Sequence, residues 1–411
     1  MNFRASQVLL LVLLASFAIA LWKDEIHAEV TYCAFCCSPD CGGANGNATP
    51  SPSPTGAPSP SPSATPPPAD LIVAPSGGDY TTIGAAYAAA SCGQTIQVRE
   101  GTYTLTSAAI NLNKTCTSGA KLTVENYPDE TPTVTCTDPE TSFKRVEHNG
   151  AYNVWRGIEV TGCYDGIKVY TSHFEIYDSY VHHNMYQGIL IAVTDSEITD
   201  VTIDGNNVEY NGYDSGNNIT CAKEEWGGES PKHCHGIYIS DFSCFGTDDI
   251  TITGNTLANH GGRGIQWNGE GCETKMLNTL VQGNTFENNS HNIILWYNVE
   301  NAVINDNDFI ATGFPETDDT SHGHFTIMNS PGNTITNNTF YSDITTYEQL
   351  QMLDTGSDVG MTVDGNIWGY RNTSWKWDNS WRSDFDSNYT SVSSWDVNGC
   401  TSLYTSYPCT P

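Results

Sequence analysis

The chain has 411 residues, with 47 acidic against 16 basic side chains and a formal net charge of −31. This excess of negative charge excludes nucleic acid and anionic membrane surfaces as partners. It also disfavours a polyanionic glycan as the ligand, unless a divalent cation such as Ca²⁺ bridges the protein and the glycan or the binding groove is locally basic. The alternative to a cation-bridged ligand is that the acidic side chains serve only solubility. We expect no organic cofactor.

The N-terminal part of the chain, up to Ala69, predicts export and a tether. Residues 1–28 combine an early Arg4 with an apolar run from Val8 to Leu21, which is typical of a signal peptide and short for a membrane span. We therefore expect a secreted or cell-surface protein with no further membrane contact; retention of this segment as an N-terminal anchor is the alternative. Residues 29–44 carry four Cys between Cys33 and Cys41, which predict two small disulfides or a metal knuckle. Residues 45–69 are rich in Pro, Ser and Thr and form a linker.

From residue 70 the sequence consists of short β-branched runs, interrupted early by one Ala-rich segment. That segment, Thr81–Ser91, begins with Thr and predicts a short helix. Such a helix would cover the open N-terminal end of a stack of strands, whose backbone groups would otherwise be unpaired.

One pattern recurs from about residue 166 to residue 368: an apolar residue, two positions, Asn, one position and another apolar residue. Its six Asn are Asn206, Asn255, Asn284, Asn307, Asn338 and Asn366, and the step from Asn206 to Asn255 is much longer than the other four. Each unit has a second alternating run, such as Gly188–Ile191 or Gly236–Ile239. Repeats of short strands without an amphipathic helix predict a β-solenoid, in which each Asn bonds the Asn on the next coil about 4.8 Å away. Asn-Gly hairpins of a β-sandwich are the alternative.

The strand His235–Ser240 and the opening segments Ile72–Ile83 and Thr95–Tyr103 resemble a known family. They are similar to the right-handed parallel β-helix of the pectate-lyase-like superfamily, which includes polysaccharide lyases, galacturonases and mannuronan C5-epimerases. The resemblance covers roughly residues 70–370. It implies an all-β, single-stranded, right-handed parallel β-helix that acts on an extracellular polysaccharide, although one fold hosts many activities.

Residues 371–411 are predicted to form a C-terminal cap. Five of the ten Trp lie at Trp368, Trp375, Trp377, Trp381 and Trp395. They either seal the end of the core or form a sugar-binding platform.

The remaining Cys predict disulfides in an oxidising compartment. Cys244 and Cys272 are separated by the length of one coil, and Cys221 with Cys234 would close a loop. Proximity in the sequence predicts the other pairs: Cys92–Cys116, Cys136–Cys163 and Cys400–Cys409.

The long step from Asn206 to Asn255 points to the candidate site. Its extra segment lies at roughly 212–234, and long insertions in repeat proteins usually lie on the binding face. The residues just before three successive strands are His235, Arg263 and His291, at two equal spacings of one coil, so we expect them on adjacent coils. Alternation places Tyr238, Gln266, Asn268 and Trp296 on the outer face, with Lys232 and His233 at the end of the insertion. Aromatic rings, amides and a few cations suit a sugar-binding cleft.

Abstraction of a proton beside a uronate carboxylate needs a base and a group that stabilises the enediolate charge. We predict His235 as the base, Arg263 as the charge-stabilising group, and Tyr238 or His291 for the second proton. Members of the superfamily use His, Lys, Arg or Tyr on neighbouring coils in this way. The Asp-Pro-His motif of mannuronan epimerases and the clustered carboxylates of galacturonases are missing here.

Other interpretations of these residues stay open. The His/Arg column could be a structural corner, and a metal could bind His233, His235 and Asp241. Asp241, Asp248 and Asp249 are candidate Ca²⁺ ligands, although loop carboxylates are usually just solvated. A glycoside hydrolase would need two carboxylates about 5–9.5 Å apart, for which Asp165, Glu270 and Glu273 are the candidates. A non-catalytic adhesin or carbohydrate-binding solenoid is the last alternative, and we take a monomer as the default state.

Overall fold

The computed structural model describes residues 70–106, 108–138, 143–216, 220, 233–311, 322–342, 347–352, 360–364 and 366–370. The chain divides into two units, Met1–Thr49 and Pro50–Pro411, and every described residue belongs to the second. The predicted signal peptide, the Cys-rich segment, the linker and the C-terminal cap lie outside the described residues.

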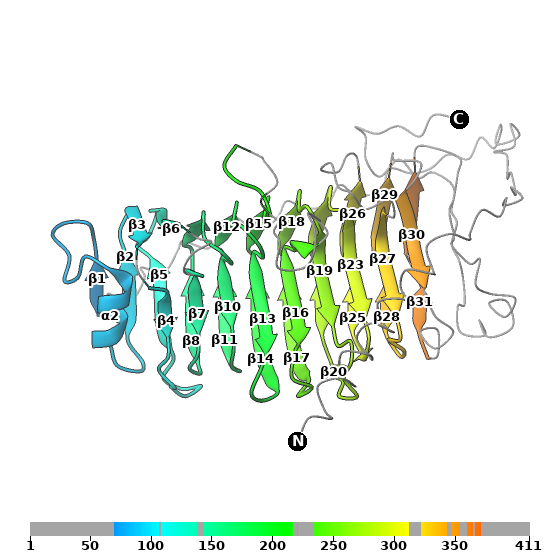
Figure 1. Cartoon of the computed structure of the whole chain (residues 1–411), viewed down its shortest axis with the longest axis horizontal. Helices are drawn as coiled ribbons and strands as arrows, with labels where there is room; N and C mark the ends of the chain where they lie inside the picture. The colour runs from blue at the N-terminus through cyan, green and yellow to red at the C-terminus, as the bar shows by residue number, and fades with distance from the viewer. Residues whose placement is uncertain are drawn as a thin grey trace, which may run out of the picture. The chain divides into compact units, whose positions relative to one another are not determined.

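The described strands pair in parallel and form three sheets (Figure 1). Sheet A has thirteen strands: β1 (Leu71–Val73), β2 (Thr95–Val98), β5 (Leu122–Asn126), β8 (Asn153–Arg156), β11 (Phe174–Tyr177), β14 (Ile198–Asp204), β17 (Thr247–Thr253), β21 (Leu280–Gln282), β25 (Val303–Asn305), β28 (Thr334–Thr336) and β31 (Thr362–Asp364), with β20 (Met276–Leu277) and β24 (Val299–Glu300) beside this path.

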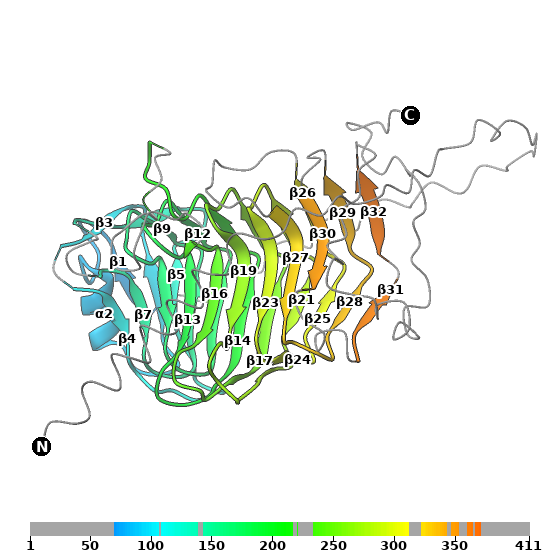
Figure 2. The ribbon, with the colours of Figure 1, turned by 45° about the vertical axis from the view of Figure 1, so that its right-hand side comes forward.

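Sheet B has ten strands: β3 (Gly101–Leu105), β6 (Pro132–Cys136), β9 (Glu159–Thr161), β12 (Tyr180–His182), β15 (Asn207–Glu209), β18 (Thr256–Ala258), β22 (Thr285–Glu287), β26 (Asp308–Ala311), β29 (Thr339–Ser342) and β32 (Ile367–Tyr370). Sheet C has nine: β4 (Ile110–Leu112), β7 (Val146–His148), β10 (Ile167–Val169), β13 (Ile189–Val193), β16 (Ile237–Asp241), β19 (Arg263–Asn268), β23 (His291–Trp296), β27 (His322–Met328) and β30 (Tyr347–Met352). Each coil passes through sheets C, A and B in turn, and Figure 2 shows the coils stacked side by side.

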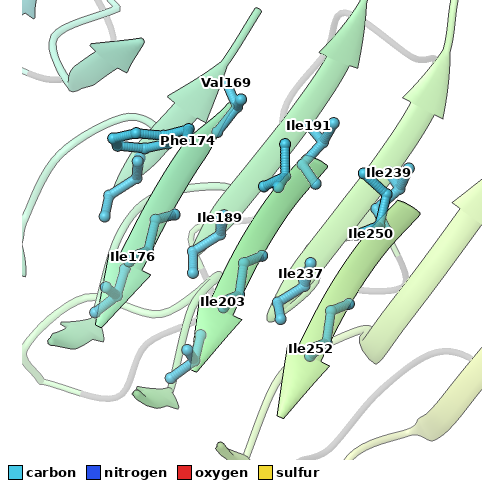
Figure 3. Packing of buried hydrophobic residues seen from close by; sticks show 14 of the residues in the cluster. Val169, Phe174, Ile176, Ile189, Ile191, Ile203, Ile237, Ile239, Ile250 and Ile252 are labelled. Carbon is cyan, nitrogen blue, oxygen red and sulfur yellow. The ribbon is translucent and has the colours of Figure 1, made fainter. Parts of the chain in front are cut away.

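The core is built from columns of identical or similar side chains on successive coils. Ile176, Ile203 and Ile252 are in register in sheet A, and Ile189 and Ile237 are in register in sheet C. All five are fully buried, and Figure 3 shows both columns. Full burial of one such side chain contributes roughly 1.5–3 kcal/mol. The alternation of β-branched and polar residues therefore sets the register of each coil on the next.

The repeated Asn form a continuous ladder at the corner between sheets A and B. From Asn206 to Asn366, each Nδ2 donates to the Oδ1 of the Asn on the next coil at 2.8–3.0 Å. The same Oδ1 also accepts the backbone N–H of the preceding Asn, as Asn255 Oδ1 does from Asn206 at 2.8 Å. Each amide thus satisfies backbone groups that a buried corner would leave unpaired.

A second, shorter ladder explains the Gly that opens the sheet C strands. Asn184 Nδ2 donates to Asn211 Oδ1 at 2.9 Å, and on the next coil His260 takes the equivalent place. A Cβ on Gly236 would lie 2.5 Å from His260 Nε2 and 2.7 Å from the carbonyl oxygen of Gly264. These glycines therefore leave the room that the ladder side chains occupy.

Helix α2 (Ile83–Ala89) is the predicted short helix. Thr82 accepts the Ala85 N–H at 3.3 Å and caps its first turn. Its buried side chains, Ile83, Ala86 and Tyr87, face the first strands, and Figure 1 shows it at the N-terminal end of the stack.

Three predicted disulfides join neighbouring coils: Cys92–Cys116, Cys136–Cys163 and Cys244–Cys272. Cys234 is also disulfide-bonded, while its predicted partner Cys221 and the pair Cys400–Cys409 lie outside the described residues. In the part of the chain that the structure describes, no helix is long and apolar enough to cross a membrane.

Candidate functional site

The outer side of sheet C brings together the predicted sugar-binding residues. Tyr238 is in register with Gln266, and Ser240 with Asn268. Asn268 is in turn in register with Trp296. We call the outer side of β16, β19 and β23 the sheet C face; the spacing of the repeats predicted these neighbours.

Hydrogen bonds fix the polar groups of the sheet C face. Asn268 Nδ2 donates to the Tyr238 hydroxyl oxygen at 2.9 Å, and Asn268 Oδ1 accepts the Glu270 N–H at 3.0 Å. Trp296 Nε1 donates to Glu270 Oε2 at 3.4 Å. Asn268 therefore holds the phenol of Tyr238 and the loop that carries Glu270 in one arrangement.

His235 lies at the edge of this face where the strands begin, and it is bonded to both neighbouring coils. Its backbone N–H donates to Gln187 Oε1 at 2.7 Å, and its Nδ1 accepts the Arg263 N–H at 3.2 Å. The side chain is 2% exposed, and burial, together with nearby Arg263 and other His, lowers its pKa well below the usual value. The ring is thus neutral at neutral pH, with its proton on Nε2. In this arrangement the His235 ring can donate a hydrogen bond through Nε2–H. It could act as a general base through Nδ1 only if the hydrogen bond from the Arg263 N–H were broken.

The other members of the predicted column differ in exposure. Arg263 and His291 are in register; Arg263 is half-buried, whereas His291 is 3% exposed with its Nδ1 3.4 Å from Ser290 Oγ. His233 is exposed, and its carbonyl oxygen accepts Gln187 Nε2 at 2.8 Å. Of the three members of the column, His235, Arg263 and His291, Arg263 is the most exposed. Lys232 and most of the 212–234 insertion lie outside the described residues, so its predicted overhang stays a prediction.

The carboxylates proposed as Ca²⁺ ligands have other partners. Asp241 is 3% exposed and accepts the N–H groups of Phe245 and Gly246 and the Thr274 hydroxyl, at 2.9–3.0 Å. Asp248 Oδ1 accepts Asn278 Nδ2 at 2.7 Å and the Asp249 N–H at 2.9 Å. Within the described ranges, no three His, Cys, Asp or Glu side chains are grouped to hold a metal. The predicted Ca²⁺ ligands Asp241, Asp248 and Asp249, like a calcium requirement, stay a prediction.

Sequence reasoning missed an ion cluster upstream on the outer side of sheet C. Arg145, 9% exposed, donates to Glu147 Oε1 at 2.8 Å, Asp165 Oδ2 at 3.2 Å and the Tyr170 hydroxyl at 3.3 Å. Burial raises the pKa of Asp165, against the opposing effect of Arg145. Lys168, in register with Glu147, adds a second cation. The sequence signal was Asp165 directly before a Gly-Ile strand, but nothing in the spacing identified Arg145 as its partner.

Comparisons with known proteins support the fold. Residues 144–309 match the family model described as Right handed beta helix region. No curated protein sequence gives a significant match. An alginate lyase from Paenibacillus sp. str. FPU-7 is 16% identical, with a TM-score of 0.50 over 72% of this chain and 96% of that one.

Two further structures are less similar in fold. The pectate lyase Pel9A is 20% identical, with a TM-score of 0.47 over 77% of this chain and 81% of its own. The A-module of the mannuronan C-5 epimerase AlgE4 from Azotobacter vinelandii is 14% identical, with a TM-score of 0.42 over 72% and 91%. The chain has the right-handed parallel β-helix fold, as the repeats and the resemblance together predicted.

Proposed function

We propose that the chain is a secreted enzyme that acts on a uronate-containing extracellular polysaccharide, by β-elimination or C5-epimerisation on the sheet C face. The observation that carries the proposal is the Tyr238 hydroxyl, which Asn268 holds at 2.9 Å on a face shared with Gln266 and Trp296. A ring for stacking, amides for hydroxyl groups and a phenol for proton transfer are what this chemistry requires. The alginate lyase of similar fold agrees with this class of substrate, and disulfides agree with an oxidising compartment.

In this mechanism Arg263 would bind the uronate carboxylate and stabilise the enediolate that forms when C5 loses its proton. We assign proton removal to Tyr238 instead of His235, because His235 Nδ1 accepts the Arg263 N–H. The neutral His235 would donate a hydrogen bond to the substrate through Nε2–H. In elimination, the phenolate form of Tyr238 would take the C5 proton, the C5–H electrons would form the C4–C5 double bond as the C4–O bond breaks, and the Tyr238 hydroxyl would return that proton to the leaving oxygen. In epimerisation, C5 would regain a proton on its other face, and His291 in its protonated form is the candidate donor.

Local charge supports an anionic substrate in spite of the acidic chain. The described outward residues of β13, β16, β19 and β23 include no carboxylate, and Arg263 and Lys168 lie at the edge and upstream. Carboxylates flank this face, because Glu270 bonds Trp296 and Glu147 is in register with Lys168, so the favourable contact for a uronate is Arg263. A calcium requirement stays a prediction, which the assay below tests by the addition of Ca²⁺.

The test is an ultraviolet assay for unsaturated uronate with polygalacturonate and alginate, with and without added Ca²⁺. The wild type should give a product that Tyr238→Phe and Arg263→Ala lower by roughly 10²-fold or more. Val303→Ala, an exposed change on sheet A, is the matched control and should stay active. Without unsaturated product, NMR of proton exchange at C5 tests epimerisation. If the wild type gives neither unsaturated product nor proton exchange at C5, the proposal is refuted.

A non-catalytic carbohydrate-binding solenoid is the second candidate. The observation that favours it is the burial of His235 and His291, at 2% and 3% exposure, which leaves few titratable groups on the face. The hydrolase alternative has less support, because Asp165 is paired with Arg145 at 3.2 Å. Retention of the wild type by polysaccharide gels without any turnover would favour binding alone.

A further inference from the structure

The loop that joins β16 to β17 exposes two aromatic side chains. Phe242 is 57% exposed and Phe245 is 46% exposed. In the described ranges only four large apolar side chains are comparably exposed, the other two being Phe143 and Val303. Two exposed aromatic side chains on one short loop mark a contact site more often than an isolated exposed residue does.

This loop is held in place at several points. The Asp241 carboxylate accepts the N–H groups of Phe245 and Gly246, and the Thr274 hydroxyl from the next coil. The disulfide Cys244–Cys272 ties the loop to that same coil. A Cβ on Gly246 would lie 2.4 Å from the Lys275 carbonyl oxygen, so the two loops pack closely. Because the backbone is already ordered, a ligand would not bear the cost of ordering it.

The loop is continuous with the sheet C face. The rings of Tyr238 and Phe242 are 6.4 Å apart between centroids and nearly perpendicular, at 82°. Asn268, which bonds the Tyr238 hydroxyl, and Trp296 lie on the next two coils in register. Phe242 therefore extends the aromatic surface of the face beyond the end of β16.

We infer that Phe242 forms a stacking subsite for a sugar ring of the polysaccharide, adjacent to the ring bound at Tyr238, with Phe245 beside it. The inference rests on the proposed function, because it assigns the same polymer to both positions. A sugar ring fits this surface because its C–H face can lie on the phenyl ring, while its hydroxyls reach Glu270 and Asn268.

Affinity electrophoresis in gels containing alginate or polygalacturonate tests this subsite. Phe242→Ala should weaken retention roughly two- to tenfold, and the double variant with Phe245→Ala at least as much. Phe242→Tyr keeps the ring and should be retained like the wild type. Val303→Ala, 38% exposed on sheet A, is the matched control and should not change retention. Equal thermal unfolding temperatures would show that every variant is folded.

Two results would overturn the inference, and they differ. If the wild type is retained and Phe242→Ala is retained equally, the subsite is wrong while the proposed function stands. If neither gel retains the wild type, polysaccharide binding fails and both proposals fall. Retention that depends on Phe242 in a protein without turnover would support the subsite and refute only the enzymatic step.

Discussion

The replacement His260→Asn tests the second ladder through its response to acid. His260 stands where the neighbouring coils have Asn211 and Asn289: its Nδ1 accepts the Asn211 N–H at 3.3 Å, and its own N–H donates to Asn289 Oδ1 at 3.1 Å. The ring is fully buried, and burial lowers its pKa from 6.5 to about 3. Asparagine would restore the amide that the ladder has on either side and remove the titrating group.

The direction of the stability change with pH follows from the protons that His260 binds in the folded and unfolded states. Between pH 6.5 and about 3 the unfolded His260 binds a proton that the folded ring does not, so acid favours unfolding across that range. One pKa unit corresponds to about 1.4 kcal/mol, so the step from pH 7 to pH 4.5 costs the wild type about 2.5 kcal/mol through this residue. His260→Asn should lose about 2.5 kcal/mol less over the same step.

The assay is guanidinium unfolding of both proteins at pH 7 and pH 4.5. We expect similar stability at pH 7 and a smaller acid loss in the variant. His233→Asn is the matched control, because His233 is exposed and should leave the acid loss unchanged. Identical acid losses in wild type and His260→Asn would refute the argument that the buried ring stays neutral in the folded state.

Three further predictions concern the coils. Gly236→Ala would place a Cβ 2.5 Å from His260 Nε2 and should cost about 1–3 kcal/mol by thermal unfolding, while Gly84→Ala, with nothing within 4 Å, should be neutral or mildly stabilising. Asn284→Ala would remove the amide that donates to the Ile252 carbonyl at 2.9 Å and the oxygen that accepts the Asn255 N–H, so we expect a loss of about 1–3 kcal/mol; an unchanged unfolding midpoint would contradict a structural ladder. Ile239→Ala removes a fully buried side chain and should cost about 2–5 kcal/mol in denaturant unfolding, and a loss below about 1 kcal/mol would show that the site collapses.

The coil architecture was predictable because a solenoid turns sequence spacing into spatial neighbours. The equal spacing from Tyr238 to Gln266 and from Ser240 to Asn268 gave their register directly. The Asn pattern likewise marked a corner, since the amide is the side chain that bonds its own copy on the next coil. Both features follow from local repetition, without any pairing between segments that are far apart in the sequence.

The environment of the candidate site was less predictable. His235 and His291 precede their strands at a corner, where alternation no longer determines whether a side chain is buried. The carboxylate partners of Arg145 lie 2 and 20 residues away, and a single sequence does not show which carboxylate faces it. His260 replaces a ladder Asn without any change in the surrounding pattern, so its structural role could be read only from its contacts.

The most direct test of the proposed function is release of unsaturated uronate by the wild type and Tyr238→Phe from polygalacturonate and alginate. The proposed mechanism predicts product from at least one of them, or proton exchange at C5 if the reaction is epimerisation, and a loss of roughly 10²-fold or more in the variant. Equal activity of the two proteins would remove Tyr238 from the chemistry. If the wild type is inactive in both measurements, the proposal that the protein is an enzyme of this class is wrong.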